Sequence, residues 1–191
     1  IELEGTDITA LGHQAIARRG ICRSFQIPQL ALELSLRDNL LVAVAAAAGR
    51  PSLWRAADAP AARERADELM RRFGLQADAD RPVLELAGGV RKLVDIAMAL
   101  ARRPRLLLLD EPTSGVSADE KFPAMRRVMG ALEGEAATVL FVEHDMDIVA
   151  EFSERVIAFY SGRVIADGTP AEVLANSEVQ RYVTGGTGVR P

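Results

Sequence analysis

The most informative stretch of this chain is Arg105-Leu-Leu-Leu-Leu-Asp-Glu-Pro-Thr-Ser-Gly115. Four consecutive leucines leave no polar face, which predicts a central strand of a parallel sheet with helices packed on both sides. Pro112 cannot continue the ladder, so Asp110 and Glu111 are expected at the carboxyl end of the strand, where open α/β sheets place their ligands. Two carboxylates there suit Mg²⁺ and a polarised water, although a solvated acidic turn would give the same pattern.

The composition is that of a globular domain with one core. The chain has 191 residues, of which 49% are hydrophobic and 26% are charged, and at this size roughly 70% of the unfolded surface can be buried. A net charge of −4 and an aromatic content of 5% give no case for a nucleic-acid partner. Cys22 is the single cysteine, which excludes an internal disulfide and fits a reducing compartment. No apolar run approaches the ~20 residues of a membrane span.

Residues 30–85 differ from the rest because they predict helices alone. Ser35 predicts the start of a helix that runs to Ala48. A second helix is predicted over residues 58–73, ended by Gly74 with Leu75 placed for a Schellman motif. We therefore expect residues 1–29 and 86–184 to form an α/β core, residues 30–85 to form an inserted helical subdomain, and residues 185–191 to be a disordered tail.

The second half of the chain predicts further strands and helices. A helix is expected over residues 91–101, and residues 138–143 predict a second buried strand. Pro123 would fall inside a helix that started at Ser117, so that helix is expected to begin near Lys121. A β-hairpin is predicted around Ser161-Gly162, and Thr169-Pro-Ala-Glu172 predicts a capping box at the start of a helix.

The order of motifs resembles the ATPase subunit of ABC transporters. That family carries, in sequence, a Q-loop, a helical subdomain, a signature, a Walker B strand, a D-loop and a switch histidine. The matching features here are Gln26 after a strand, the helical insert, Leu86-Ala-Gly-Gly-Val90, the strand Leu106–Glu111, Ser114-Gly-Val-Ser117 and a strand that ends in His144. The resemblance covers nearly the whole chain and implies a P-loop NTPase-like fold.

The resemblance implies separate roles for four residues. Asp110 would hold Mg²⁺, usually through water, as suits a hard ion with oxygen ligands. Glu111 would orient and deprotonate the attacking water, and His144 would contact the γ-phosphate and that water. Gln26 would reach the metal and the water through its amide. Taken alone, Glu111 also reads as an exposed acid and Gln26 as an ordinary residue after a strand, whereas His13 reads as a surface residue.

The signature would act on nucleotide held by an opposing subunit. Gly88 and Gly89 let the backbone approach a phosphate, and the following helix directs its positive end at the anion, although a plain glycine turn at a helix start is the alternative. Ala87 stands where the family usually has serine and Val90 where it has glutamine, so we expect weakened contacts. Leu86 completes the segment, and Ser114, Gly115, Val116 and Ser117 would form the D-loop.

The phosphate-binding loop of the family has no match. Gly-x-x-x-x-Gly-Lys-[Ser/Thr] occurs nowhere in residues 1–191. In the family this loop and its strand precede the position matched by Ile1, so the chain reads as N-terminally truncated, with the N-terminal strand and the Walker A segment absent. We expect one edge of the sheet to be exposed, and residues 1–191 alone to bind MgATP weakly or not at all.

The resemblance favours an ABC importer for branched-chain amino acids or similar small polar solutes. The residues that indicate this branch include Arg23-Ser-Phe-Gln26 and Asp110-Glu-Pro-Thr113. The resemblance implies that the protein binds ATP and Mg²⁺. It also implies two protein partners: a second ATPase subunit in a homodimer or heterodimer, and a membrane permease that contacts residues 30–85 and the Q-loop. A periplasmic or extracellular solute-binding protein would take part indirectly, and the subunit would lie on the cytoplasmic face of the membrane. The alternatives are a non-catalytic, truncated domain that only binds partners, and a soluble ABC ATPase of DNA repair or translation.

Overall fold

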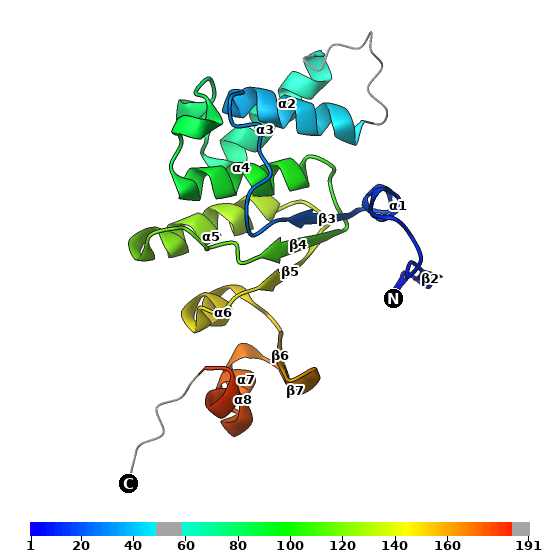
Figure 1. The fold of residues 1–191 in the computed structure, drawn as a ribbon, viewed down its shortest axis with the longest axis vertical. Coiled ribbons are helices and arrows are strands. Elements are labelled where there is room, and N and C mark those ends of the chain that lie inside the picture. Colours follow the sequence, from blue (N-terminus) through cyan, green and yellow to red (C-terminus); the bar gives the residue numbers. More distant parts are fainter. Residues whose placement is uncertain (49–58, 185–191) are drawn as a thin grey trace. The chain divides into compact units, whose positions relative to one another are not determined.

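The computed structural model describes residues 1–48 and 59–184 (Figure 1). The predicted helix start at residue 58 and the predicted tail of residues 185–191 lie outside these ranges. The chain divides into two compact units, Ile1–Val142 and Glu143–Pro191. The four segments expected from the sequence remain a prediction.

A parallel sheet forms the centre of the first unit. It contains β3 (Ile21–Ser24), β4 (Leu106–Asp110) and β5 (Thr138–Val142), in the order β3-β4-β5. The register pairs Ile21 with Leu106 and Asp110 with Val142, so the carboxyl ends of the three strands meet at one edge (Figure 1). The leucine-rich strand is thus central, as the sequence predicts.

The leucine strand is buried on one face only, which corrects the expectation of two covered faces. Leu107 and Leu109 are fully buried and share a core with apolar residues of α4 (Gly88–Leu100) and α5 (Ala118–Leu132), whereas Leu106 and Leu108 are half-buried. The expectation that β5 is buried is also wrong, since Leu140 is 50% and Val142 is 57% exposed. An all-apolar run has no polar face, so its sequence could not indicate that one side is less covered.

The helical insert forms as its caps predict. The Ser35 side chain accepts a hydrogen bond from the Asp38 N–H at 3.0 Å and caps α2 (Leu36–Ala47). Helix α3 (Pro60–Phe73) ends at Gly74 with φ 67°, and the Leu75 N–H donates to the Met70 carbonyl at 2.8 Å. This is the predicted Schellman ending. The short helices η1 (Gln76–Asp78) and η2 (Val83–Glu85) lead back to the core.

Helix α5 corrects a second expectation. It begins at Ala118 and not near Lys121, so Pro123 lies inside the helix. Proline removes one backbone hydrogen bond there. The first turn forms nevertheless, because the N–H groups of Glu120 and Lys121 both donate to the Ser117 carbonyl, at 2.9 and 3.1 Å. Burial of five apolar residues farther along offsets the lost bond; they are Ala124, Met125, Val128, Ala131 and Leu132.

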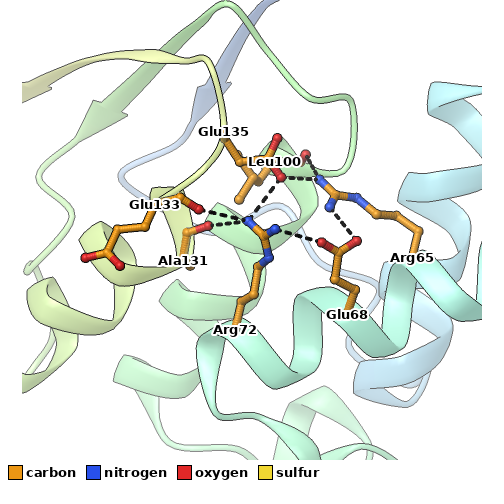
Figure 2. Close-up of polar contacts among 7 residues, drawn as sticks. All are labelled: Arg65, Glu68, Arg72, Leu100, Ala131, Glu133 and Glu135. Carbon is orange, nitrogen blue, oxygen red and sulfur yellow. Dashed lines mark hydrogen bonds and ion pairs between the residues drawn. The ribbon is translucent and has the colours of Figure 1, made fainter.

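A charged network joins the insert to the core (Figure 2). Arg65 and Arg72 extend from α3, and Glu68 on the same helix binds both of them at 2.8 Å. Glu135, which follows α5, accepts from Arg65 at 3.1 Å and from Arg72 at 3.2 Å. Arg65 also donates to the carbonyl of Leu100 at the end of α4. The network therefore fixes α3 to the ends of two core helices.

The first unit opens with a short hairpin and a helix. Strands β1 (Glu2–Leu3) and β2 (Thr6–Asp7) pair antiparallel, and α1 (His13–Arg18) precedes β3.

The described part of the second unit, residues 143–184, contains a hairpin and three short helices. After α6 (Met146–Phe152), strands β6 (Val156–Tyr160) and β7 (Arg163–Gly168) pair around Ser161 and Gly162, as predicted. Helix α7 (Pro170–Ala175) has the predicted capping box on Thr169. Helix α8 (Ser177–Tyr182) was not predicted from the sequence; Asn176 caps it.

Candidate functional site

The carboxyl ends of β3 and β4 bring together three of the residues singled out from the sequence. Asp110 ends β4 and Glu111 follows it, and the Glu111 N–H donates to the Val142 carbonyl at 3.0 Å. The Gln26 side chain, from the loop after β3, donates from Nε2 to Glu111 Oε2 at 2.9 Å. The site therefore contains two adjacent carboxylates and one amide.

Glu111 has an unfavourable backbone conformation. Its φ is 45°, in the left-handed region, and it precedes a proline, which disfavours all but extended backbone. Two hydrogen bonds hold it there: its N–H donates to Val142, and its carbonyl accepts from the Ser114 N–H at 3.0 Å. Such strain costs on the order of 1–3 kcal/mol and is frequent where a side chain must be aimed for function.

Arg23 is a residue of the site to which the sequence analysis gave no role there. Its Nη2 lies 2.7 Å from Asp110 Oδ2. The contact joins neighbouring strands, because Arg23 on β3 is paired with Leu108, two residues before Asp110. The sequence does show an arginine in the strand before Gln26. Its contact with Asp110 could be inferred only from the order of the strands, which places β3 beside β4. Arg23 would have to share or release Asp110 when a cation approaches.

The donor set fits Mg²⁺. Asp110, Glu111 and Gln26 offer carboxylate and amide oxygens, the hard ligands that this ion takes. Within residues 1–48 and 59–184, no three His, Cys, Asp or Glu residues form a group that could hold a metal. Mg²⁺ does not require such a cage, because it is usually bound by one or two carboxylates together with substrate phosphates.

Two charged residues of α4 surround the backbone of the Gln26 loop. Lys92 is 2% exposed and donates to the carbonyls of Phe25 at 2.8 Å and Asp110 at 2.9 Å. Asp95 accepts from the N–H groups of Phe25 at 3.0 Å and Gln29 at 3.3 Å. Burial raises the pKa of the Asp95 carboxyl above its usual value of 3.8.

The signature glycines pack against the D-loop. Gly88 and Gly89 lie in the first turn of α4. A Cβ on Gly88 would lie 3.3 Å from the Gly115 carbonyl oxygen, and one on Gly89 would lie 3.4 Å from Val116 Cγ2. Packing within the chain thus already favours small residues there. The N-cap is Ala87, whose side chain cannot accept a hydrogen bond from the first N–H groups of the helix.

The remaining predicted site residues lie beside the glycines and the D-loop, except for His144. Leu86 is buried and Val90 is half-buried beside the glycines, and Ser114 and Ser117 flank the D-loop turn. His144 belongs to the second unit, which begins at Glu143. Its side chain is exposed, and its N–H donates to the Glu143 carboxylate at 3.3 Å. His144 and the carboxylates thus belong to different units, and the role of His144 stays a prediction.

Comparison with known proteins identifies the family. The family model described as ABC transporter matches residues 1–114, more than half of the chain. The chain belongs to the ABC transporter family. As the intact protein it is an ATP hydrolase of the ABC type, as the resemblance implied.

Relatives agree on the family but differ in what they transport. The high-affinity branched-chain amino acid transport ATP-binding protein BraF of Pseudomonas aeruginosa is 33% identical over 193 residues, which cover 97% of this chain and 75% of BraF. The lipopolysaccharide export system ATP-binding protein LptB of Escherichia coli K12 is 34% identical over 185 residues, which cover 97% of this chain and 73% of LptB. Similar identity to both relatives shows the family without deciding the transported substrate.

A solved structure of the family has the same fold. MJ1267, an ATP-binding cassette of an ABC transporter, superposes with a TM-score of 0.80 at 28% identity, over 94% of this chain and 74% of MJ1267. The expected α/β, P-loop NTPase-like architecture is thereby confirmed. Over the part of the chain that the structure describes, no helix is long and apolar enough to span a bilayer.

Proposed function

We propose that this protein is the ATP-hydrolysing subunit of an ABC importer for branched-chain amino acids or similar small polar solutes. The observation that carries the proposal is the contact of the Gln26 amide with the Glu111 carboxylate, beside Asp110. This arrangement puts two carboxylates and an amide at the ends of adjacent parallel strands, where such sheets bind ligands. One carboxylate would serve as a base, the other would bind the metal, and the amide would orient water. Similarity to BraF supports the substrate class.

Glu111 would act as the general base. Its Oε2 already accepts one hydrogen bond from Gln26, so the amide fixes the direction of the carboxylate. The carboxylate would accept a proton from water as the water oxygen bonds to the γ-phosphorus and the bond to the ADP oxygen breaks. Bound Mg²⁺ would neutralise phosphate charge; Asp110, with the Gln26 amide, would hold it.

The remaining predicted residues would complete two sites between paired subunits. The first turn of α4, with Leu86, Ala87 and Val90 around the two glycines, would face the γ-phosphate of nucleotide on the opposing subunit. Its amide groups would supply the contact, since Ala87 offers no hydroxyl. Residues 114–117 would line the subunit boundary, and His144 would contact the γ-phosphate of its own nucleotide. The pair could be a homodimer or a heterodimer.

A permease would dock on the Gln26 loop and residues 30–85. Among the residues of these two segments that the structure describes, six large apolar side chains are 42% exposed or more: Phe25, Ile27, Leu32, Leu34, Val42 and Leu84. Three of them are neighbours, because the Leu84 N–H donates to the Leu32 carbonyl at 2.9 Å and the Val83 N–H donates to the Leu34 carbonyl at 3.0 Å. Exposed apolar groups in one region are typical of a protein-binding surface. The subunit would then lie on the cytoplasmic face of the membrane, and a periplasmic or extracellular solute-binding protein would take part only through the permease.

An ATPase assay on the protein with its complete natural sequence tests this proposal. We expect phosphate release that requires Mg²⁺, and a loss of most activity in Asp110→Asn. Asp119→Asn is the matched control, because it removes one exposed carboxylate from the first turn of α5. Phosphate release that is absent, or that is equal in all three proteins, would favour a non-catalytic domain that only binds partners.

A further inference from the structure

Lys92 is a buried cation that no role described so far requires. It lies in α4 one turn after the signature glycines and is 2% exposed. Its ammonium donates to three carbonyls, those of Phe25 at 2.8 Å, Asp110 at 2.9 Å and Gln26 at 3.4 Å. Burial of a charged group is costly unless its donors are satisfied, and these three carbonyls accept the donors of Lys92.

The residue type matches the acceptors. The chain has only two lysines, Lys92 and Lys121, and its other cationic side chains are arginines. An ammonium is a compact charge with three N–H donors, whereas arginine presents a planar fork that suits a carboxylate. Three carbonyl oxygens from two chain segments therefore match lysine.

Asp95 holds the same loop from its donor side. It lies three residues after Lys92 in α4, and its two carboxylate oxygens accept from the Phe25 and Gln29 N–H groups, at 3.0 and 3.3 Å. The positive charge of Lys92 partly offsets the pKa increase that burial causes in Asp95. The loop backbone from Phe25 to Gln29 is thus bound through both its carbonyls and its amides by one helix.

We propose that Lys92 and Asp95 are positioning residues, which fix the Gln26 loop and the end of β4 to the signature helix and so set the contact between Gln26 and Glu111. This inference rests on the proposed function, because it concerns the geometry of that hydrolytic site. Lys92 joins three parts of the site: the helix that begins with the signature, the loop that carries Gln26, and the carbonyl of Asp110. Loss of the Lys92 donors would then release the Gln26 loop from the end of β4, where Glu111 follows.

Hydrogen exchange tests the positioning directly and does not require activity. In Lys92→Met, which keeps the length of the buried chain but removes its donors, exchange of the Phe25 and Gln29 amides should become faster by about tenfold or more. Lys121→Met is the matched control, since it removes the other lysine, which lies in α5 and not in α4. Parental exchange over residues 25–29 in a folded Lys92→Met protein would overturn the proposal.

Steady-state kinetics of the protein with its complete natural sequence tests the consequence. Misplacement of Gln26 should lower kcat of Lys92→Met by between about tenfold and a hundredfold, with KM for MgATP changed much less. Lys92→Arg keeps the charge and its donors and should restore part of kcat. Parental kcat in folded Lys92→Met, or an equal loss in Lys121→Met, would contradict the inference.

A variant of Asp95 keeps the test decisive if Lys92→Met does not fold. Asp95→Asn keeps one acceptor oxygen in nearly the same shape, so faster exchange is expected at one of the two amides, together with a lower kcat. Unchanged exchange and kcat would overturn the proposal. If the parental protein hydrolyses no ATP, the proposed function fails, whereas the exchange measurements still decide whether these residues hold the loop.

Discussion

Replacement of Glu135 by alanine should destabilise the first unit strongly. Figure 2 shows Glu135 between two arginines of α3. One of its oxygens, Oε1, accepts from Arg65 Nη2 at 3.1 Å and from Arg72 Nη1 at 3.2 Å. The side chains of Arg65 and Glu135 are only 9% and 11% exposed, so water cannot readily replace the lost partner.

The contacts that remain set the size of the effect. Removing one partner of a buried ion pair costs about 3–5 kcal/mol, because the other charge stays buried. Arg65 retains Glu68 at 2.8 Å and the Leu100 carbonyl at 3.1 Å, and Arg72 retains the Ala131 carbonyl at 3.0 Å. We therefore expect the low end, a loss of about 3 kcal/mol in the free energy of unfolding.

Urea unfolding followed by circular dichroism measures this loss. Glu133→Ala is the matched control, since it removes the same charge from an exposed side chain two residues earlier. Arg72 binds the backbone carbonyl of Glu133, which the substitution keeps. The control should change stability by less than about 0.5 kcal/mol. Equal losses in the two variants would refute the reasoning, because they would assign the effect to net charge and not to the buried network.

Two further outcomes follow from local geometry. Gly74→Ala should lower the free energy of unfolding by about 1 kcal/mol, because the residue has φ 67°, and a thermal melt that matches the parent would contradict this. Burial raises the pKa of the Asp95 carboxyl above 3.8, so the folded protein favours the protonated form. The contribution of Asp95 to stability is therefore greatest below pH 3.8, and it falls as the pH rises through the pKa of the folded state. The stability of the parent relative to Asp95→Asn should therefore decrease over that range in unfolding experiments at several pH values; a constant or increasing difference would show that the sign is wrong.

Local patterns in the sequence predicted much of the fold. The run Leu106–Leu109 followed by Pro112 indicated a central parallel strand with carboxylates at its end, and Ser35 and Gly74 indicated helix ends. Each of these signals depends on residues a few positions apart, whose geometry is fixed by the local backbone. Tertiary packing therefore changes these local features little.

Buried charges could not be predicted in the same way. Lys92 and Arg65 stand in amphipathic helices, where charged residues usually face solvent. Their partners are remote in sequence: Lys92 binds the Phe25 carbonyl, and Arg65 binds Glu135. The contact between Arg23 and Asp110 likewise depends on the order of strands. Pro123 was misjudged for a related reason, since the cost of one missing hydrogen bond was visible and the burial that offsets it was not.

The most direct test of the central claim is a single-turnover ATPase measurement on Glu111→Gln in the protein with its complete natural sequence. Glutamine keeps the shape of the side chain at this strained position but cannot accept the proton from water. We predict that ATP binding is retained and that phosphate release falls by about a hundredfold or more. Hydrolysis at the parental rate would contradict the account, because Glu111 could then not be the base.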